Sequence, residues 1–275
     1  MSDLLRIENV SKTYPSGGPP WNRRHVHALD DVSLTVNTGR TMGLVGESGS
    51  GKSTLGRCVL GLTGVDSGRV VFEGTDIQSL SRAARATFRR RVQPVFQDPY
   101  GSLDPRWPVG RSVRESLDSF RIGTSADRDK RVLELFDRVG LKVSYAGRMP
   151  SQLSGGQRQR VAIAAALATE PELIIADEPV SALDVSVQAQ ILNLFMDLQT
   201  DLGVTSIFIT HDLGVVEHVS DEIAVLYRGV IVERGDVGQV MRAPVHAYTR
   251  TLLDAVPRAD PREPASGSRT AQPSQ

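Results

Sequence analysis

Short runs of apolar residues alternate with helical patterns along the chain. Residues 41–45, 173–176 and 205–210 are mostly apolar, as expected of strands buried in a parallel sheet. Residues 52–62 predict a helix, and residues 185–202 predict an amphipathic helix. Because strands that alternate with helices form parallel sheets, this pattern predicts an α/β core.

The N-terminal part of the chain has a different pattern. Residues 4–9 and 28–36 predict strands, and residues 69–77 predict a further strand with a turn. Residues 15–27 are rich in Pro, Gly and Arg, which favours an exposed hairpin loop. We therefore expect an N-terminal antiparallel β-subdomain beside the α/β core.

Three further regions have patterns of their own. Residues from about 98 to about 165 have helical periodicity and few strand signals, which predicts an inserted α-helical subdomain. Residues 222–235 predict a closing hairpin. The Pro-, Ser- and Arg-rich residues 258–275 predict a disordered tail.

Composition and charge exclude several classes of protein. Lys and Arg number 32 and Asp and Glu number 32 among 275 residues, so net charge provides no attraction to nucleic acid. The single cysteine, Cys58, excludes a disulfide within the chain and is expected to pack in the core. No apolar run reaches the length of about 18 residues that spans a membrane, and the N-terminus does not resemble a secretory signal.

Residues 46–54, GESGSGKST, fit the nucleoside-triphosphate loop, with a predicted strand before them and a predicted helix after them. Glycines let backbone N–H groups close around phosphates. Lys52 would place a positive charge at the β and γ phosphates, and the Ser53 hydroxyl would bind Mg²⁺. The residues of this phosphate loop are Gly46, Glu47, Ser48, Gly49, Ser50, Gly51, Lys52, Ser53 and Thr54.

Two carboxylates follow the apolar run 173–176. Asp177 and Glu178 are expected at the C-terminal edge of the sheet, where open α/β folds bind ligands. Asp177 is suited to hold Mg²⁺, and Glu178 is suited to polarise an attacking water as a general base. Alone, the pair would indicate an exposed acidic turn, but the apolar strand and the phosphate loop favour a site.

Three other residues are open to two interpretations. Gln97 is either a surface residue or an amide that reaches Mg²⁺ or the attacking water. His211 follows the predicted strand 205–210, and is either structural or a hydrogen-bond partner of the γ-phosphate. Tyr14 either packs against its neighbours or stacks on adenine.

Residues 153–157, LSGGQ, form a second glycine-rich start of a predicted helix. They lack a lysine and belong to the helical subdomain, so they are not the primary phosphate loop. We hypothesise that they act in trans, where the helix N-terminus of one copy contacts the γ-phosphate held by another in a head-to-tail dimer. Ser154 would offer its hydroxyl, Gly155 and Gly156 would allow close approach, and Gln157 completes the motif.

Six motifs in this order resemble those of the ATP-binding cassette family over about residues 4–257. The resemblance implies ATP and Mg²⁺ as ligands, Tyr14 as the adenine-stacking aromatic, and Gln97 and His211 as switch residues. It also implies Asp184 as an acid at the dimer interface and the trans role of Ser154. The motifs are GESGSGKST (46–54), VFQDP (95–99), LSGGQ (153–157), LIIADEP (173–179), SALD (181–184) and THD (210–212).

Residues 96–106 and 243–257 resemble the ATPase subunits of oligopeptide, dipeptide and nickel importers. The resemblance implies a P-loop NTPase domain over residues 1–257, of which about 236–257 is the subfamily's C-terminal segment. It implies a second cassette subunit, identical or not, two transmembrane permeases and an extracytoplasmic solute-binding protein, at the cytoplasmic face of the cell membrane. Some relatives hold an iron–sulfur cluster on C-terminal cysteines, but with Cys58 alone we expect none.

The expected function is ATP hydrolysis by a subunit that dimerises around two Mg-ATP and powers an importer of peptides or a related small solute. A soluble cassette ATPase acting on nucleic acid or ribosomes is the alternative, but such proteins usually carry two cassettes or long insertions. A GTPase switch is a third possibility, but the chain has no Asn-Lys-x-Asp motif. We expect no nucleic-acid partner, and the sequence does not separate peptide from nickel, glutathione-like or sugar cargo.

Overall fold

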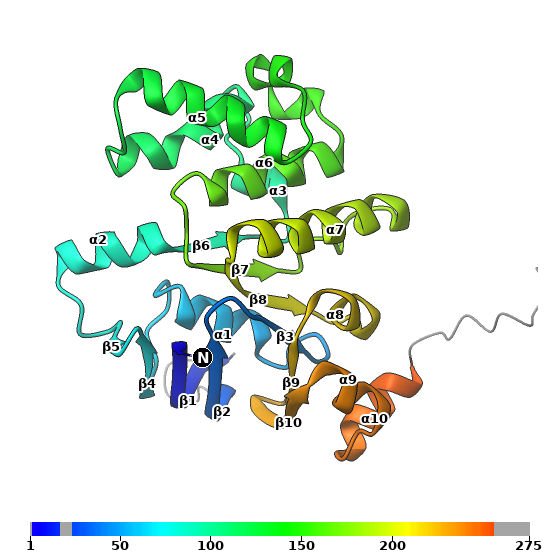
Figure 1. Cartoon of the computed structure of the whole chain (residues 1–275). Coiled ribbons are helices and arrows are strands. Elements are labelled where there is room, and N and C mark those ends of the chain that lie inside the picture. The colour runs from blue at the N-terminus through cyan, green and yellow to red at the C-terminus, as the bar shows by residue number, and fades with distance from the viewer. Residues whose placement is uncertain (1, 17–23, 256–275) are drawn as a thin grey trace, which may run out of the picture.

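The computed structural model describes residues 2–16 and 24–255. A central sheet has a group of helices on one side of it and a smaller N-terminal sheet on the other (Figure 1). Within the described ranges, no helix is both long and apolar enough to cross a membrane. The predicted tail, residues 258–275, lies outside the described residues.

The central sheet forms the predicted α/β core. Its six strands are β3 (Thr41–Val45), β6 (Val92–Val95), β7 (Leu173–Asp177), β8 (Thr205–Thr210), β9 (Glu222–Tyr227) and β10 (Val230–Asp236). They lie in the order β10-β9-β3-β8-β7-β6, parallel except for the pairing of β10 with β9. The predicted closing hairpin is the pair β9 and β10, and the predicted strands at 41–45 and 205–210 have the expected bounds.

The N-terminal strands form a separate antiparallel sheet, which confirms that part of the predicted fold class. Its strands are β1 (Asp3–Ser16), β2 (Arg24–Asn37), β4 (Ser67–Phe72) and β5 (Thr75–Asp76). They lie in the order β2-β1-β4-β5. Val26 and Ala28 of β2 in this sheet line a cleft beside the central sheet.

The prediction of an exposed hairpin loop over residues 15–27 was wrong at both ends of that range. Pro15 pairs with His25, so the two strands continue into the predicted loop. At Pro15 the only described strand beside β1 is β2, because β4 pairs with β1 only as far as Ser11, and such an edge position tolerates proline. The remaining residues, 17–23, lie outside the described part of the chain.

Helices surround the central sheet. They are α1 (Lys52–Val59), α2 (Arg82–Arg91), α7 (Val185–Leu202), α8 (Leu213–Val219), α9 (Val237–Arg242) and α10 (Ala247–Asp254). α7 has the predicted bounds, but α1 ends before the predicted residue 62. Gly61, with φ of +63°, adopts the left-handed conformation that ends helices.

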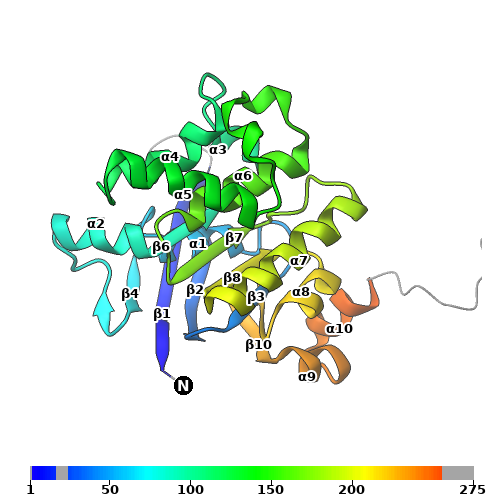
Figure 2. The same cartoon turned by 45° about the horizontal axis from the view of Figure 1, so that its top comes forward.

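Between β6 and β7 the regular elements of the described chain are all helical, as the predicted fold class requires. They are α3 (Pro99–Ser102), α4 (Val109–Ser119), α5 (Ser125–Arg138), the 3₁₀ helices η1 (Val143–Gly147) and η2 (Pro150–Gln152), and α6 (Gly155–Leu167). α4, α5 and α6 pack against one another above the sheet (Figure 2).

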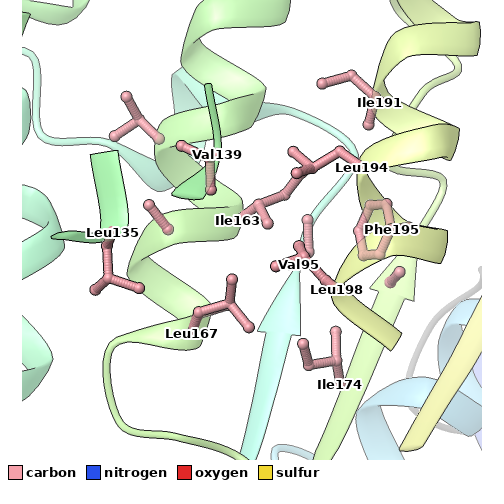
Figure 3. Packing of buried hydrophobic residues seen from close by; sticks show 14 of the residues in the cluster. Val95, Leu135, Val139, Ile163, Leu167, Ile174, Ile191, Leu194, Phe195 and Leu198 are labelled. Carbon is pink, nitrogen blue, oxygen red and sulfur yellow. The ribbon is translucent and has the colours of Figure 1, made fainter. Parts of the chain in front are cut away.

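One hydrophobic core joins the inserted helices to the central sheet. Ile163 of α6 and Phe195 of α7 lie in one cluster with Val95 of β6 and Ile174 of β7 (Figure 3). All four are at most 7% exposed, and burial of such a side chain contributes roughly 1.5–3 kcal/mol. This core fixes the start of α6, and with it residues 153–157, relative to the sheet.

A second core lies between the two sheets and holds α1. Cys58 of α1 is 1% exposed within this cluster. Burial raises the pKa of its thiol to about 11, so the thiol stays protonated and unreactive near neutral pH. The predicted packing role of Cys58 is confirmed. The buried face of α1, the helix that follows the phosphate loop, is packed in this core.

Candidate functional site

The phosphate loop joins the end of β3 to the start of α1, as predicted. Gly46, Gly49 and Gly51 have φ of +152°, +80° and +111°. A Cβ at Gly46 would overlap the carbonyl oxygen of Leu226, and a Cβ at Gly51 would overlap that of Ala28. At these two positions a side chain could enter only if the backbone moved.

Lys52 is a buried cation inside this loop. It is 4% exposed, and its Nζ donates to the carbonyl oxygens of Gly46 at 2.6 Å and Glu47 at 2.8 Å. Burial lowers the pKa of the ammonium group because the charged form is poorly solvated there. The Ser50 hydroxyl is also buried, with no hydrogen-bond partner among the described residues. A buried positive charge beside a free hydroxyl suits the loop to an anion.

The first predicted carboxylate contacts the loop directly. Asp177 ends β7, and its Oδ1 accepts a hydrogen bond from the Ser53 hydroxyl at 3.0 Å. Burial raises the pKa of Asp177, since desolvation disfavours the carboxylate. A hydroxyl and a carboxylate oxygen side by side are ligands of the kind that Mg²⁺ prefers.

The second carboxylate brings the remaining predicted residues together. Glu178 Oε2 accepts from Gln97 Nε2 at 3.4 Å, and Glu178 Oε1 lies 3.1 Å from His211 Nδ1. The three residues follow β6, β7 and β8, which are neighbours in the sheet, so they meet at the edge where open α/β sheets bind ligands. Glu178 also has φ of +48°, a strained value for a residue with a side chain, and such strain is often found at functional sites.

A cleft of about 620 Å³ connects these groups, a volume typical of ligand sites. The phosphate loop forms much of its lining, together with polar Gln97, Glu178 and His211. The remaining side chains are apolar, and come from β2 and α10: Val26, Ala28 and Leu252. The cleft therefore offers charged groups for phosphates and an apolar wall for a less polar part of a ligand.

Tyr14 does not belong to the lining of this cleft. It pairs directly with Val26, which does line the cleft, so the two side chains project from the same face of the β1–β2 ribbon. Lys12 Nζ lies 5.6 Å from the centre of the Tyr14 ring. Stacking of Tyr14 on adenine stays a prediction.

Residues 153–157 lie apart from the cleft and hydrogen-bond among themselves. Ser154 is the N-cap of α6: its Oγ accepts from the Gln157 N–H at 3.3 Å, and Gln157 Oε1 accepts from the Ser154 N–H at 3.0 Å. Gly156 has a packing role that the sequence did not indicate, because a Cβ there would overlap Val187 of α7. Within one chain, the structure does not bring these residues to the phosphate loop.

Asp184 stands at the N-cap position of α7 and is exposed. Its side chain makes no capping hydrogen bond, so the carboxylate has no role in starting α7. It lies in the segment that follows Glu178, close in sequence to Leu183, which contacts the start of α6 at Gly155.

Two residues of the C-terminal helix were missed by the sequence analysis. Leu252 lines the cleft, and Tyr248 accepts a hydrogen bond from the backbone N–H of Glu47 in the phosphate loop at 3.0 Å. The sequence marks the segment that contains them only as a feature of a subfamily. No local pattern could have revealed the contact, because the two partners lie 201 residues apart.

Comparison with known proteins decides the family. The family model described as "ABC transporter" matches residues 29–181, and that described as "Oligopeptide/dipeptide transporter, C-terminal region" matches residues 232–275. The chain belongs to the ABC transporter family. It is therefore an ATP-binding ATPase cassette, which confirms the predicted resemblance and activity.

Individual relatives agree with this assignment. A probable peptide ABC transporter ATP-binding protein of Sinorhizobium fredii is 50% identical, over 95% of this chain and 75% of the relative. The oligopeptide transport ATP-binding protein OppF of Streptococcus mutans is 47% identical, over 94% of this chain and 83% of the relative. Among solved structures, the dimeric post-hydrolysis state of the ATP-binding cassette MJ0796 with ADP and Pi has a TM-score of 0.74 and 31% identity, over 85% of this chain and 98% of that one.

Proposed function

We propose that this ABC cassette hydrolyses ATP as one half of a head-to-tail dimer and powers a membrane importer for peptides or related small solutes. The observation that carries the catalytic part is the contact of one carboxylate, Glu178, with both Gln97 and His211 in the cleft that contains Lys52. The peptide cargo is supported by the peptide-transport functions of the two relatives above.

Mg²⁺ fits the site through the Ser53 hydroxyl, the Asp177 carboxylate and the Gln97 amide. When bound, the ion supplies positive charge against the β and γ phosphates of ATP. Among the described residues no three His, Cys, Asp or Glu side chains are grouped so that they could hold a metal ion by themselves. The proposal therefore relies on one carboxylate together with neutral oxygens and substrate phosphates. We propose Ser53, Asp177 and Gln97 as the metal-binding residues.

The side chains around the cleft suit the hydrolytic step. Lys52 would leave its loop carbonyls to pair with the β and γ phosphates, since a buried ammonium gains most from an anionic partner. Glu178 would take a proton from the attacking water, while Gln97 and His211 hold its carboxylate and the γ-phosphate in place. The other phosphate-loop residues would cradle the phosphates, and Tyr14 would stack on adenine.

The dimer is proposed from the position of the second glycine motif. Residues 153–157 do not line the cleft of their own chain, yet α6 presents a helix N-terminus, which attracts anions. In a two-fold dimer, Ser154, Gly155, Gly156 and Gln157 would face the γ-phosphate bound by the partner, with exposed Asp184 at the interface. The structure of the cassette MJ0796, which is dimeric with ADP and Pi bound, supports a dimer of such cassettes.

Light scattering of a Glu178→Gln variant tests the dimer. Without hydrolysis, Mg-ATP should shift the variant from monomer to dimer, and ATP removal should reverse the shift. Ser154→Arg in this background should prevent dimerisation by placing a cation and bulk at the interface. Ser119→Arg is the matched control, because Ser119 is exposed at the end of α4. A dimer that tolerates Ser154→Arg as well as Ser119→Arg would contradict the trans role.

Transport requires partners at the cytoplasmic face of the cell membrane. We propose a second cassette subunit and two transmembrane permeases, fed by an extracytoplasmic solute-binding protein. Purification of tagged Glu178→Gln protein from its own cells in detergent and Mg-ATP, followed by mass spectrometry, tests this assembly. Multi-span permeases among the partners would support the importer, whereas ribosomal proteins or nucleic acid without any membrane protein would contradict it.

A further inference from the structure

The C-terminal helix α10 reaches the nucleotide cleft at two positions. Tyr248 Oη accepts the hydrogen bond from the Glu47 N–H at 3.0 Å, and Leu252, four residues later, lines the cleft. Residues four apart lie on one face of a helix. One face of α10 therefore contacts both the phosphate loop and the apolar part of the cleft.

This helix is anchored to the body of the protein rather than to the loop. Glu233 of β10 accepts hydrogen bonds from the N–H groups of Val245, at 2.7 Å, and His246, at 2.9 Å. The Tyr248 ring packs on the ring of Tyr227 at the end of β9, with centroids 4.0 Å apart. Tyr248 is thus a fixed point to which the phosphate loop is attached.

The peptide groups on either side of Glu47 are held by different partners. The Glu47 N–H bonds to Tyr248, while the Glu47 carbonyl accepts from Lys52 Nζ at 2.8 Å. Under the proposed function, Lys52 leaves that carbonyl when a triphosphate binds. The bond to Tyr248 does not involve the phosphates and can persist, so it can keep the loop in its open, phosphate-accepting shape.

We propose that α10 completes the nucleotide site, with Tyr248 as a positioning residue of the phosphate loop and Leu252 as a contact for the nucleoside. The nucleoside is assigned to Leu252 because the phosphate loop, Gln97, Glu178 and His211 account for the polar part of the cleft. Val26, Ala28 and Leu252 are what remains for the base and sugar. This inference rests on the proposed function and assigns the C-terminal segment a part in it.

Two ligands distinguish the proposed role of Tyr248 from that of Leu252. Mg-ATP carries a nucleoside, whereas magnesium tripolyphosphate offers the same phosphates without one. Titration calorimetry would measure both on full-length protein in the Glu178→Gln background, which prevents hydrolysis. Tyr248→Phe should weaken both ligands by about threefold to tenfold, the effect of one lost neutral hydrogen bond. Leu252→Ala should weaken ATP by about threefold, from reduced apolar contact, and leave tripolyphosphate unchanged.

Tyr227→Phe is the matched control. It removes a hydroxyl from the other ring of the stacked pair but leaves both the stacking and the bond to Glu47 in place. Its affinities for both ligands should equal those of the parent. In the hydrolysing chain, Tyr248→Phe should raise the KM for ATP by a similar factor, with kcat within about twofold.

Several outcomes would overturn the inference. A Tyr248→Phe variant with a lower Tm but parental affinity would show that Tyr248 only stabilises the fold. Equal losses for both ligands in Leu252→Ala would remove the nucleoside contact. A parent that binds neither ligand would refute the proposed nucleotide site itself, and failure to find permeases would refute only the importer.

Discussion

The chain contains two glycine-rich helix starts, residues 46–52 and residues 153–157. They differ in the charged and polar groups that each loop holds. The first encloses the buried ammonium of Lys52, whose hydrogen-bond partners among the described residues are loop carbonyls. The second has no buried ammonium: Ser154 and Gln157 form a capping box, and the Leu153 carbonyl accepts from Arg158 Nη1 at 2.6 Å. Glycine and a helix N-terminus are common to both, so neither is enough to make a phosphate site within one chain.

Their glycines also differ in the neighbour that excludes a side chain. At Gly46 and Gly51 the neighbour is a backbone carbonyl, whereas at Gly156 it is the side chain of Val187. A second mutation can replace a neighbouring side chain by a smaller one and so remove an overlap. No mutation can remove a neighbouring backbone carbonyl. The overlap of an added methyl group should therefore be relieved by a second mutation when the methyl group is at Gly156, but not when it is at Gly46 or Gly51.

Removal of the buried cation should have the largest effect. Lys52→Ala should lower the ATPase rate by roughly 10²–10³, because no other described lysine or arginine lines the cleft to stabilise developing phosphate charge. Phosphate release measures the rate. Gln157→Ala is the comparison at the other loop, and should leave ATP binding by the monomer unchanged. A Lys52→Ala variant with more than about a tenth of parental activity would contradict the role of the buried charge.

A methyl group at Gly51 should strongly destabilise the phosphate loop. Gly51→Ala combines φ of +111° with an overlap on the Ala28 carbonyl, and we expect a loss of about 3 kcal/mol in the free energy of unfolding. Gly49→Ala is the control: Gly49 has φ of +80°, but no described atom lies within 4 Å of the place its Cβ would take, so it should lose only about 1 kcal/mol. Urea denaturation measures both, and equal losses would mean that the backbone contact is unimportant.

The sequence was sufficient for features that depend on local pattern. Apolar runs predicted the bounds of β3 and β8, and amphipathic spacing predicted those of α7. The extension of β1 and β2 through Pro15 and His25 depends on cross-strand pairing, which composition does not encode. The early end of α1 follows from the left-handed conformation of Gly61, which residue type alone does not fix.

In the candidate site too, local motifs were predictable from the sequence, whereas contacts between distant segments were not. Motifs predicted Asp177, Glu178, Gln97 and His211, and the order of strands brings them together at one edge of the sheet. The contact of Tyr248 with the phosphate loop was not predictable, because its partner is a backbone N–H that carries no residue signature. The packing of Gly156 was hidden for a related reason, since it depends on how α6 and α7 lie in space.

At the second loop, a methyl group should have a smaller effect, and one that a second mutation can reverse. Gly156→Ala should lose about 1–2 kcal/mol through overlap with Val187, net of the better helix propensity of alanine. Adding Val187→Ala should recover most of the loss that the overlap causes, which a double-mutant cycle would measure as coupling. Gly155→Ala, whose Cβ would lie 3.2 Å from Leu183, is the milder control. Strictly additive losses would show that the two positions do not clash.

The smallest effect concerns the buried carboxylate beside the phosphate loop. Burial raises the pKa of Asp177 in the folded protein above its unfolded value, so the folded state binds the proton more tightly. Stability from this group is therefore greatest at acid pH and falls as the pH rises through the raised pKa. Asp177→Asn keeps an oxygen for the Ser53 hydroxyl but carries no charge. Without ATP it should be more stable than the parent at pH 7, by about 1 kcal/mol.

That advantage should shrink as the pH falls, because the parent carboxyl becomes neutral too, and urea denaturation across the pH range would follow it. Asp184→Asn is the control, because Asp184 is exposed and asparagine is an equally good N-cap residue. The Asp177→Asn variant should also lose ATPase activity, since it lacks the carboxylate proposed for Mg²⁺. A parent that gains stability relative to Asp177→Asn as the pH rises would mean that Asp177 is stabilised as an anion. The hydrogen bond from the Ser53 hydroxyl and the nearby positive charges of Arg57 and Lys52 would then outweigh the cost of burying the carboxylate.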